Sequence, residues 1–128
     1  MKIIWHGHAS FRIEIEDQVL LIDPWLEGNP MLPEDQWAAA TEGATHVLVT
    51  HGHFDHANSA VGICGDKGIP CVGIFDLMGF WEQKHGLEVI GFNKGGTVKL
   101  GNVAVTMVNA THSSSEQTAD GPRYLGNE

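Results

Sequence analysis

Three histidines and one aspartate fall within six residues of the chain, at His51, His53, Asp55 and His56. Neutral imidazoles and carboxylates are ligands of borderline divalent metals such as zinc, manganese and iron. The cluster follows directly after the apolar residues 47–49, which have the pattern of a buried strand. Because a loop leaving a strand can aim several side chains at one point, these residues predict a metal site at a strand end.

The spacing within the cluster divides it into two pairs. His51 and His53 are two residues apart on one side of an extended loop, whereas Asp55 and His56 are adjacent and start the next expected helix. Each pair could therefore serve a separate metal ion. The competing interpretation is a polar loop that happens to be rich in histidine.

Three residues elsewhere in the chain are candidates to join this cluster. His112 follows the apolar residues 103–108, although a lone histidine at a strand end is more often structural than a ligand. Asp23 ends the apolar residues 19–22 just before a proline. It either forms a turn or holds the imidazole of a metal ligand, a support that metal-bound histidines usually require. His8 either belongs to a tight turn or lines the site.

The pattern of apolar residues predicts an α/β domain with a mixed sheet and flanking helices. Its strands are expected at residues 2–5, 11–16, 19–22, 45–50, 70–74, 87–92, 97–100 and 103–108. The first three strands resemble an antiparallel meander, the middle ones alternate with helices, and the last two form a hairpin. Helices are expected at residues 34–40, 57–67 and 76–85, the last with Asp76 as its N-cap and Gly86 as its stop. Residues 118–128 are polar and rich in turn formers.

Length and composition limit the classes of function. The 128 residues allow a single domain, and seven basic against sixteen acidic residues give a net charge of −9. This balance argues against nucleic-acid partners and against anionic membranes. The apolar runs are too short to span a bilayer, and the first residues lack a signal-peptide pattern, so a cytoplasmic protein is expected. Cys64 and Cys71 are then expected to be reduced and structural.

The segment of residues 50–56 resembles the HxHxDH motif of the metallo-β-lactamase superfamily. Within that superfamily the chain is similar to a group of uncharacterised metal-dependent hydrolases related to L-ascorbate-6-phosphate lactonase. The supporting segments are residues 7–11, 21–25, 29–30, 93–96 and 110–114. The resemblance implies an αββα sandwich of two similar halves.

The resemblance also implies roles for individual residues. His51, His53 and His112 match the ligands of a first metal, and Asp55 and His56 match ligands of a second and are the catalytic candidates. Asp23 matches an acid beneath the metals. One or two divalent ions are therefore expected, zinc first, with manganese or iron as alternatives.

The chain departs from the family pattern in its length. Family members are roughly twice as long, and their later half supplies a bridging aspartate and a final histidine. After His112 the sequence has no histidine, and Asp120 lies too close to be the bridging residue. We therefore expect residues 1–128 to form one incomplete domain, the N-terminal half of the sandwich. A C-terminal remainder or a second copy of the chain would complete it.

The leading functional hypothesis is a metal-dependent hydrolase that uses a metal-activated hydroxide on a small lactone or phosphoester. One alternative is a metal-binding fragment without turnover, because the later ligands are missing. A second alternative is an RNA-processing nuclease of the same superfamily, which the acidic composition disfavours.

Overall fold

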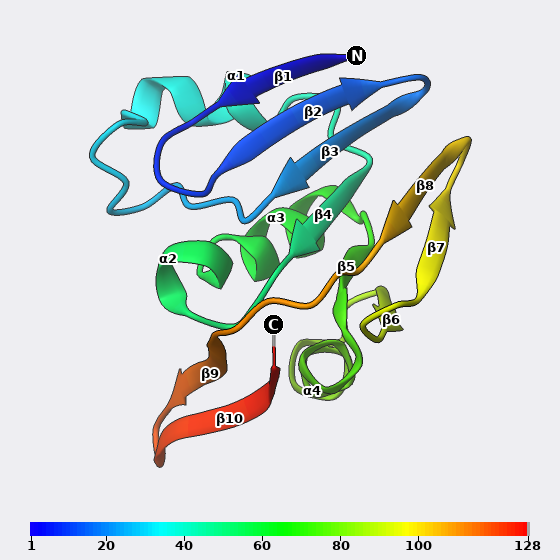
Figure 1. Cartoon of the computed structure of the whole chain (residues 1–128). Helices are drawn as coiled ribbons and strands as arrows, with labels where there is room; N and C mark the ends of the chain where they lie inside the picture. Colours follow the sequence, from blue (N-terminus) through cyan, green and yellow to red (C-terminus); the bar gives the residue numbers. More distant parts are fainter. Residues whose placement is uncertain (128) are drawn as a thin grey trace.

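A six-stranded mixed sheet forms the centre of the molecule (Figure 1). The computed structural model describes residues 1–127 of the chain. Neighbouring strands follow chain order, from β1 to β6; the first three are antiparallel and the remaining neighbours are parallel. The strands are β1 (Lys2–Trp5), β2 (Phe11–Ile15), β3 (Gln18–Ile22), β4 (His46–Val49), β5 (Cys71–Ile74) and β6 (Val89–Phe92). The expected meander and the mixed α/β sheet are confirmed.

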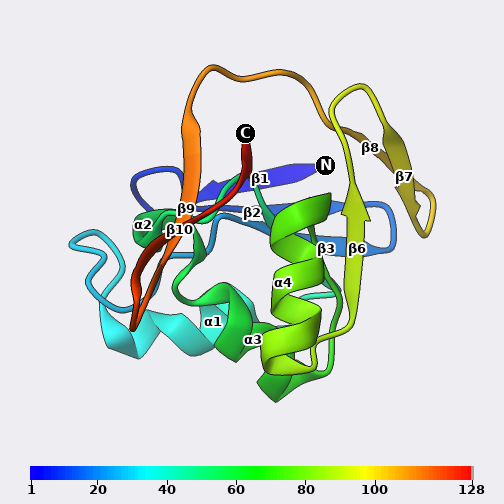
Figure 2. The same ribbon diagram turned by 90° about the horizontal axis from the view of Figure 1, so that it is seen from below.

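Short helices connect the parallel strands. They are the 3-10 helix η1 (Glu34–Gln36), α1 (Trp37–Thr41), α2 (Phe54–Ala57), α3 (Ala60–Lys67) and α4 (Phe75–His85). Figure 2 shows α1 and α3 together on one side of the antiparallel strands. Among the described residues, no helix is both long and apolar enough to cross a membrane.

Two predictions about the helices were wrong in detail. The helix expected at residues 57–67 is divided into α2 and α3, and Ser59 lies between them, where its hydroxyl accepts the backbone N–H of Leu26 at 2.9 Å. Asp76 is not the N-cap of α4, because the helix begins one residue earlier, and its carboxylate lies in the first turn near the positive end of the helix dipole. Gly86 does end α4, in the left-handed conformation that glycine adopts at little cost.

The sheet is covered on both faces by apolar side chains. Alternate strand residues point to opposite faces, so Val47 packs towards the helices whereas Leu48 packs towards a hairpin. The helix side also contains Trp81 and the free thiols of Cys64 and Cys71. The other face is covered by the hairpin of β7 (Thr97–Leu100) and β8 (Val103–Thr106), as the sequence predicted.

The last part of the chain forms a second hairpin, of β9 (Ser113–Thr118) and β10 (Gly121–Asn127). The expectation of a turn-rich tail at residues 118–128 was therefore wrong for residues 121–127, which form β10, and residue 128 lies outside the described residues. Strand β9 is polar along its length and lacks the apolar alternation by which strands are detected. Its place is fixed by polar contacts instead: the Trp81 Nε1–H of α4 donates to Glu116 Oε2 at 2.6 Å.

Candidate metal centre

The candidate ligands gather at one end of the sheet because three strands have their carboxyl ends there. Strands β1, β3 and β4 run in the same direction, and β3 and β4 pair in parallel with Ile22 opposite Leu48. The loops after these strands carry His8, Asp23 and His51, respectively. Loops at the carboxyl ends of parallel strands are common binding sites in α/β sheets.

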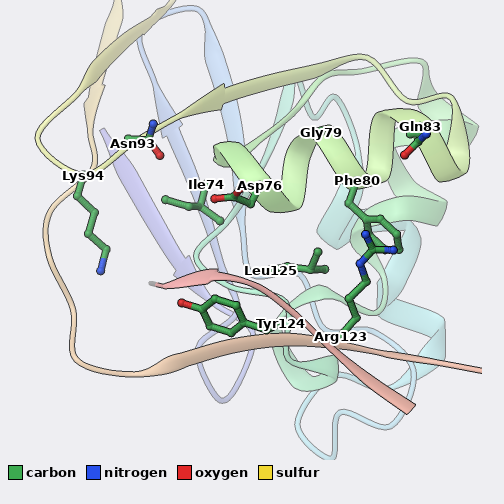
Figure 3. Close-up of a pocket in the computed structure, with 10 residues that line it drawn as sticks. All are labelled: Ile74, Asp76, Gly79, Phe80, Gln83, Asn93, Lys94, Arg123, Tyr124 and Leu125. Carbon is green, nitrogen blue, oxygen red and sulfur yellow. The ribbon is translucent and has the colours of Figure 1, made fainter. Parts of the chain in front are cut away.

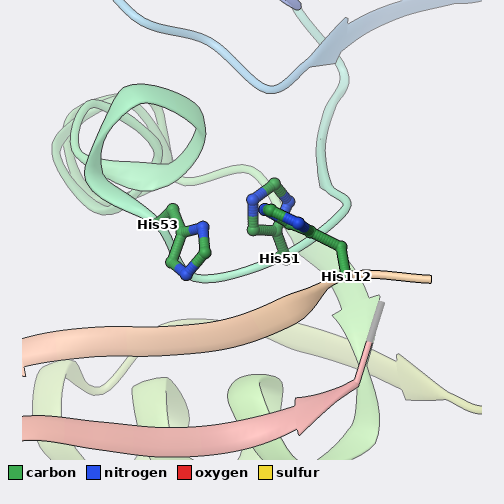
Figure 4. Close-up of side chains that lie close together, drawn as sticks. All are labelled: His51, His53 and His112. Atoms are coloured by element: carbon green, nitrogen blue, oxygen red, sulfur yellow. The ribbon is translucent and has the colours of Figure 1, made fainter. Parts of the chain in front are cut away.

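One group of donors consists of His51, His53 and His112. Each offers one ring nitrogen, and these nitrogens lie within 4.8 Å of one another. The ring centroids are 4.6 to 5.0 Å apart and the ring planes are nearly perpendicular, so the imidazoles do not stack. Figure 4 shows the three side chains turned toward a common space. The sequence suggested that His112 ends a strand, and this was wrong. Strand β8 stops at Thr106, and His112 directly precedes β9.

The loop of His51 and His53 is attached to the strand that follows His112. The Gly52 N–H donates to the buried Ser114 hydroxyl at 3.0 Å. A Cβ at Gly52 would lie 3.0 Å from the Ser115 carbonyl oxygen, which is tighter than ordinary contact. Glycine therefore allows the close approach that brings His112 to the other two histidines.

A second group of donors consists of His8, Asp55 and His56, again within 4.8 Å of one another. His8 Nε2 lies 3.0 Å from Asp55 Oδ2 and 3.2 Å from His56 Nε2. The ring centroids of His51 and His56 are 4.1 Å apart, so the two groups are direct neighbours.

Asp23 supports both groups from beneath. Asp23 is 2% exposed, and its carboxylate accepts the Thr50 N–H at 2.8 Å and the Thr50 hydroxyl at 2.7 Å. It also lies 2.8 Å from His56 Nδ1, so His56 donates there and carries its lone pair on Nε2.

Thr50 extends this arrangement to the first group. Because its hydroxyl donates to Asp23, it accepts the Nδ1–H of His51 at 2.9 Å. The lone pair of His51 is thereby placed on Nε2, the nitrogen suited to a metal. The sequence analysis missed Thr50, since its contact with Asp23 exists only once β3 and β4 pair.

The electrostatics keep His51 neutral. Its side chain is 1% exposed, and burial, followed by the neighbouring His56, lowers its pKa from 6.5 to about 4. A neutral imidazole can donate a lone pair to a metal, whereas an imidazolium cannot. His51 is therefore ready to bind a cation at neutral pH.

The backbone is strained at two residues of the site. His8 and Asp23 have φ of 49° and 44°, in the left-handed region that non-glycine residues rarely adopt. Such conformations persist where the surrounding structure holds them, and they concentrate at functional sites. The structure thus brings together every candidate residue of the sequence analysis: His8, Asp23, His51, His53, Asp55, His56 and His112.

Comparison with known proteins places these observations in a family. A family model described as a beta-lactamase superfamily domain matches residues 2–126. A UPF0173 metal-dependent hydrolase from Dinoroseobacter shibae is 62% identical over 128 residues, which are 100% of this chain and 56% of that protein. The chain thus spans about half the length of the curated relatives that it matches.

Solved structures share the fold. Igni18, a metallo hydrolase from Ignicoccus hospitalis, is 30% identical with a TM-score of 0.74, covering 88% of this chain and 49% of that one. CmlA, a diiron beta-hydroxylase from Streptomyces venezuelae, is 21% identical with a TM-score of 0.66 over 84% of this chain and 23% of that one; it shows the fold alone. The chain, whose clustered histidines lie at the carboxyl ends of the strands of a mixed sheet, belongs to the family described as the beta-lactamase superfamily domain.

Proposed function

We propose that the chain carries the metal-binding part of a hydrolase that acts on a small lactone or phosphoester. His51, His53 and His112 would hold one divalent ion, zinc first, and Asp55 and His56 would contribute to a second. The observation that carries the proposal is the convergence of imidazole nitrogens from two distant segments, with one ring nitrogen each within 4.8 Å.

The donors fit such ions in type and in protonation. Imidazole nitrogens with neighbouring carboxylates suit borderline divalent metals, and zinc in catalytic sites takes three protein ligands and leaves one position open. The low pKa of His51 keeps this buried ring neutral, as a ligand must be. Asp23 fixes the tautomer of His56, which is the usual role of a carboxylate behind a metal-binding histidine.

In this proposal the ion would activate water, and the side chains around it would hold the ion and border the space for a substrate. A divalent ion bound here would lower the pKa of coordinated water towards about 7 and would polarise a substrate oxygen. The exposed His112 leaves one side of the first group open to a substrate. Trp25 lies edge-on to His8 at 5.5 Å and to the exposed Phe54 at 6.3 Å, so these rings form an aromatic border beside the second group.

The test combines metal analysis with hydrolysis assays. We expect the purified chain to hold at least one equivalent of zinc, and a panel of lactones and phosphoesters to identify a substrate that a chelator protects from hydrolysis. His51→Ala should remove the zinc held by the first group and abolish hydrolysis, whereas His85→Ala, at an exposed position outside both groups, should change neither property. A chain that binds no divalent metal would contradict the proposal.

A second candidate function is metal binding without turnover. The chain spans 56% of its relative from Dinoroseobacter shibae, so the whole relative serves as the comparison for this candidate. Parallel assays of that relative and of this chain distinguish the two functions. Hydrolysis by the relative alone, with zinc bound to both, would favour binding without turnover.

A further inference from the structure

His8 lies where the second group of donors meets, and its function is open. We propose that His8 is a metal ligand, whose Nε2 joins Asp55 Oδ2 and His56 Nε2 as the third protein donor to a second divalent ion. The inference rests on the metal centre proposed above.

The spacing of the three donor atoms matches the coordination of one ion. The separations are 3.0 Å from His8 Nε2 to Asp55 Oδ2, 3.2 Å from His8 Nε2 to His56 Nε2, and 3.9 Å from His56 Nε2 to Asp55 Oδ2. Two ligands of a tetrahedral zinc, each about 2.1 Å from the ion, lie about 3.4 Å apart. The three atoms therefore form a triangle of the size that one such ion requires.

The protonation pattern also favours a cation at this point. His56 directs Nδ1 at Asp23, so its Nε2 presents a lone pair to His8. The Asp55 carboxylate presents a second acceptor to the same His8 nitrogen, which carries at most one proton. A divalent ion satisfies all three donors, and the charges of Asp23 and Asp55 balance it.

The backbone of His8 is held in the conformation that aims its ring at this point. Its φ of 49° is unfavourable for most residues, and the Trp5 Nε1–H stabilises the turn by donating to the His8 carbonyl at 2.9 Å. Gly7, with φ of 99°, precedes it, and a Cβ there would lie only 2.7 Å from Met31 Cβ. The His8 side chain is still 43% exposed, so an ion can reach it from solvent.

The donor count gives His8 a specific role within this chain. Among the residues that the structure describes, Asp55 and His56 bring two donor atoms to this point and His8 brings a third, the number of protein ligands that catalytic zinc sites normally use. His8 comes from a different segment, the loop after β1, and so links that loop to α2. A competing role is that His8 only positions the Asp55 carboxylate through a hydrogen bond.

The experiment is a calorimetric titration of the full chain with zinc, using His8→Asn. Asparagine tolerates the left-handed backbone, so this variant removes the imidazole with little strain. We expect two equivalents in the wild type. In His8→Asn we expect the affinity for the first zinc equivalent to be unchanged and the affinity for the second to weaken by at least about 10- to 100-fold. His85→Asn is the matched control, and thermal unfolding checks that the variants are folded.

A direct readout separates ligation from positioning. In chain labelled with nitrogen-15 at histidine and loaded with cadmium-113, a ligand nitrogen shows one-bond coupling to the metal. Coupling at His8 Nε2 would establish the bond. Absence of this coupling, or an unchanged second equivalent in His8→Asn, would overturn the inference and leave the proposed function standing. Failure of the wild type to bind any metal would overturn both.

Discussion

The candidate metal centre and the hollow between α4 and β10 are built in opposite ways. The hollow has a volume of about 670 Å³ and is lined by both charged and aromatic side chains. Figure 3 shows Lys94 and Arg123 at opposite ends of it. Arg123 covers the Phe80 ring at 4.5 Å, and Lys94 donates to Asn109 at 3.1 Å, so each cation is engaged separately. No potential metal-ligand group among residues 1–127 includes a residue of this hollow.

The metal centre has the reverse character. Its donors come from separate loops and point at one another, one of them is nearly inaccessible, and two of its residues have strained backbones. Convergent lone pairs and strain are costly to maintain, whereas a wide hollow requires only imperfect packing. The difference teaches that the candidate metal centre is distinguished by convergence of donors and not by the size of a cavity.

The largest difference between the two regions is expected when one side chain is removed from each of them. In His51→Ala we expect the zinc equivalent of the first group to be lost and hydrolysis to fall by at least about 1,000-fold, because a metal supplies several kcal/mol of catalysis. Arg123→Ala in the hollow should leave metal content and kcat unchanged. Equal losses in both variants would show that the two regions act as one site.

Acid should lower the free energy of unfolding of the metal-free protein, because unfolding allows the buried His51 to take up a proton. The pKa of His51 is about 4 in the folded chain and near 6.5 when unfolded, so the unfolded chain binds the extra proton first. The free energy of unfolding should therefore be undiminished above about pH 6.5 and fall by about 3 kcal/mol as the pH approaches 4.

Urea unfolding at several pH values in the presence of a chelator measures this effect. His51→Gln should flatten the profile, since glutamine does not titrate. An identical slope in the wild type and in His51→Gln would assign the acid sensitivity to other groups.

Asp23→Asn tests whether the support beneath the donors matters. The amide keeps the shape of the side chain and can accept the Thr50 N–H, but it loses the charge that orients His56. We expect zinc affinity to weaken by about 10- to 100-fold. Calorimetric titration measures the affinity, and circular dichroism controls for the fold; an affinity equal to that of the wild type would refute the role of Asp23.

The smallest effect is expected in the hollow itself. Arg123→Ala removes an exposed cation from the Phe80 ring, which should lower the free energy of unfolding by about 0.5–1 kcal/mol. Chemical denaturation of the zinc-loaded chain measures this difference. A loss of several kcal/mol would mean that the hollow is more tightly coupled to the fold than its contacts indicate.

The parts of the site that the sequence predicted are those with a local pattern. His51, His53, Asp55 and His56 lie within six residues of the chain, and the apolar residues of β4 predict the strand before them. Thr50 and Ser114 gave no such signal, because their contacts depend on pairing between segments distant in sequence.

The fold shows the same limit. Gly86 marked the end of α4 by its own conformational preference, so the end of this helix was predictable. The serine-rich β9 was not, since its position depends on Trp81 and other residues that approach only in the folded chain. Long-range polar contacts therefore account for most of what the sequence could not predict.

The position of His112 directly before β9 has a consequence for the unfolded chain. An ion shared with His53 would close a long loop of polypeptide, as a crosslink does, and would reduce the number of conformations open to the denatured state. Unlike a disulfide, this crosslink is reversible and depends on concentration, adding about 4 kcal/mol at a free metal level 1,000 times the Kd. The melting temperature would then rise with the free metal concentration around the protein.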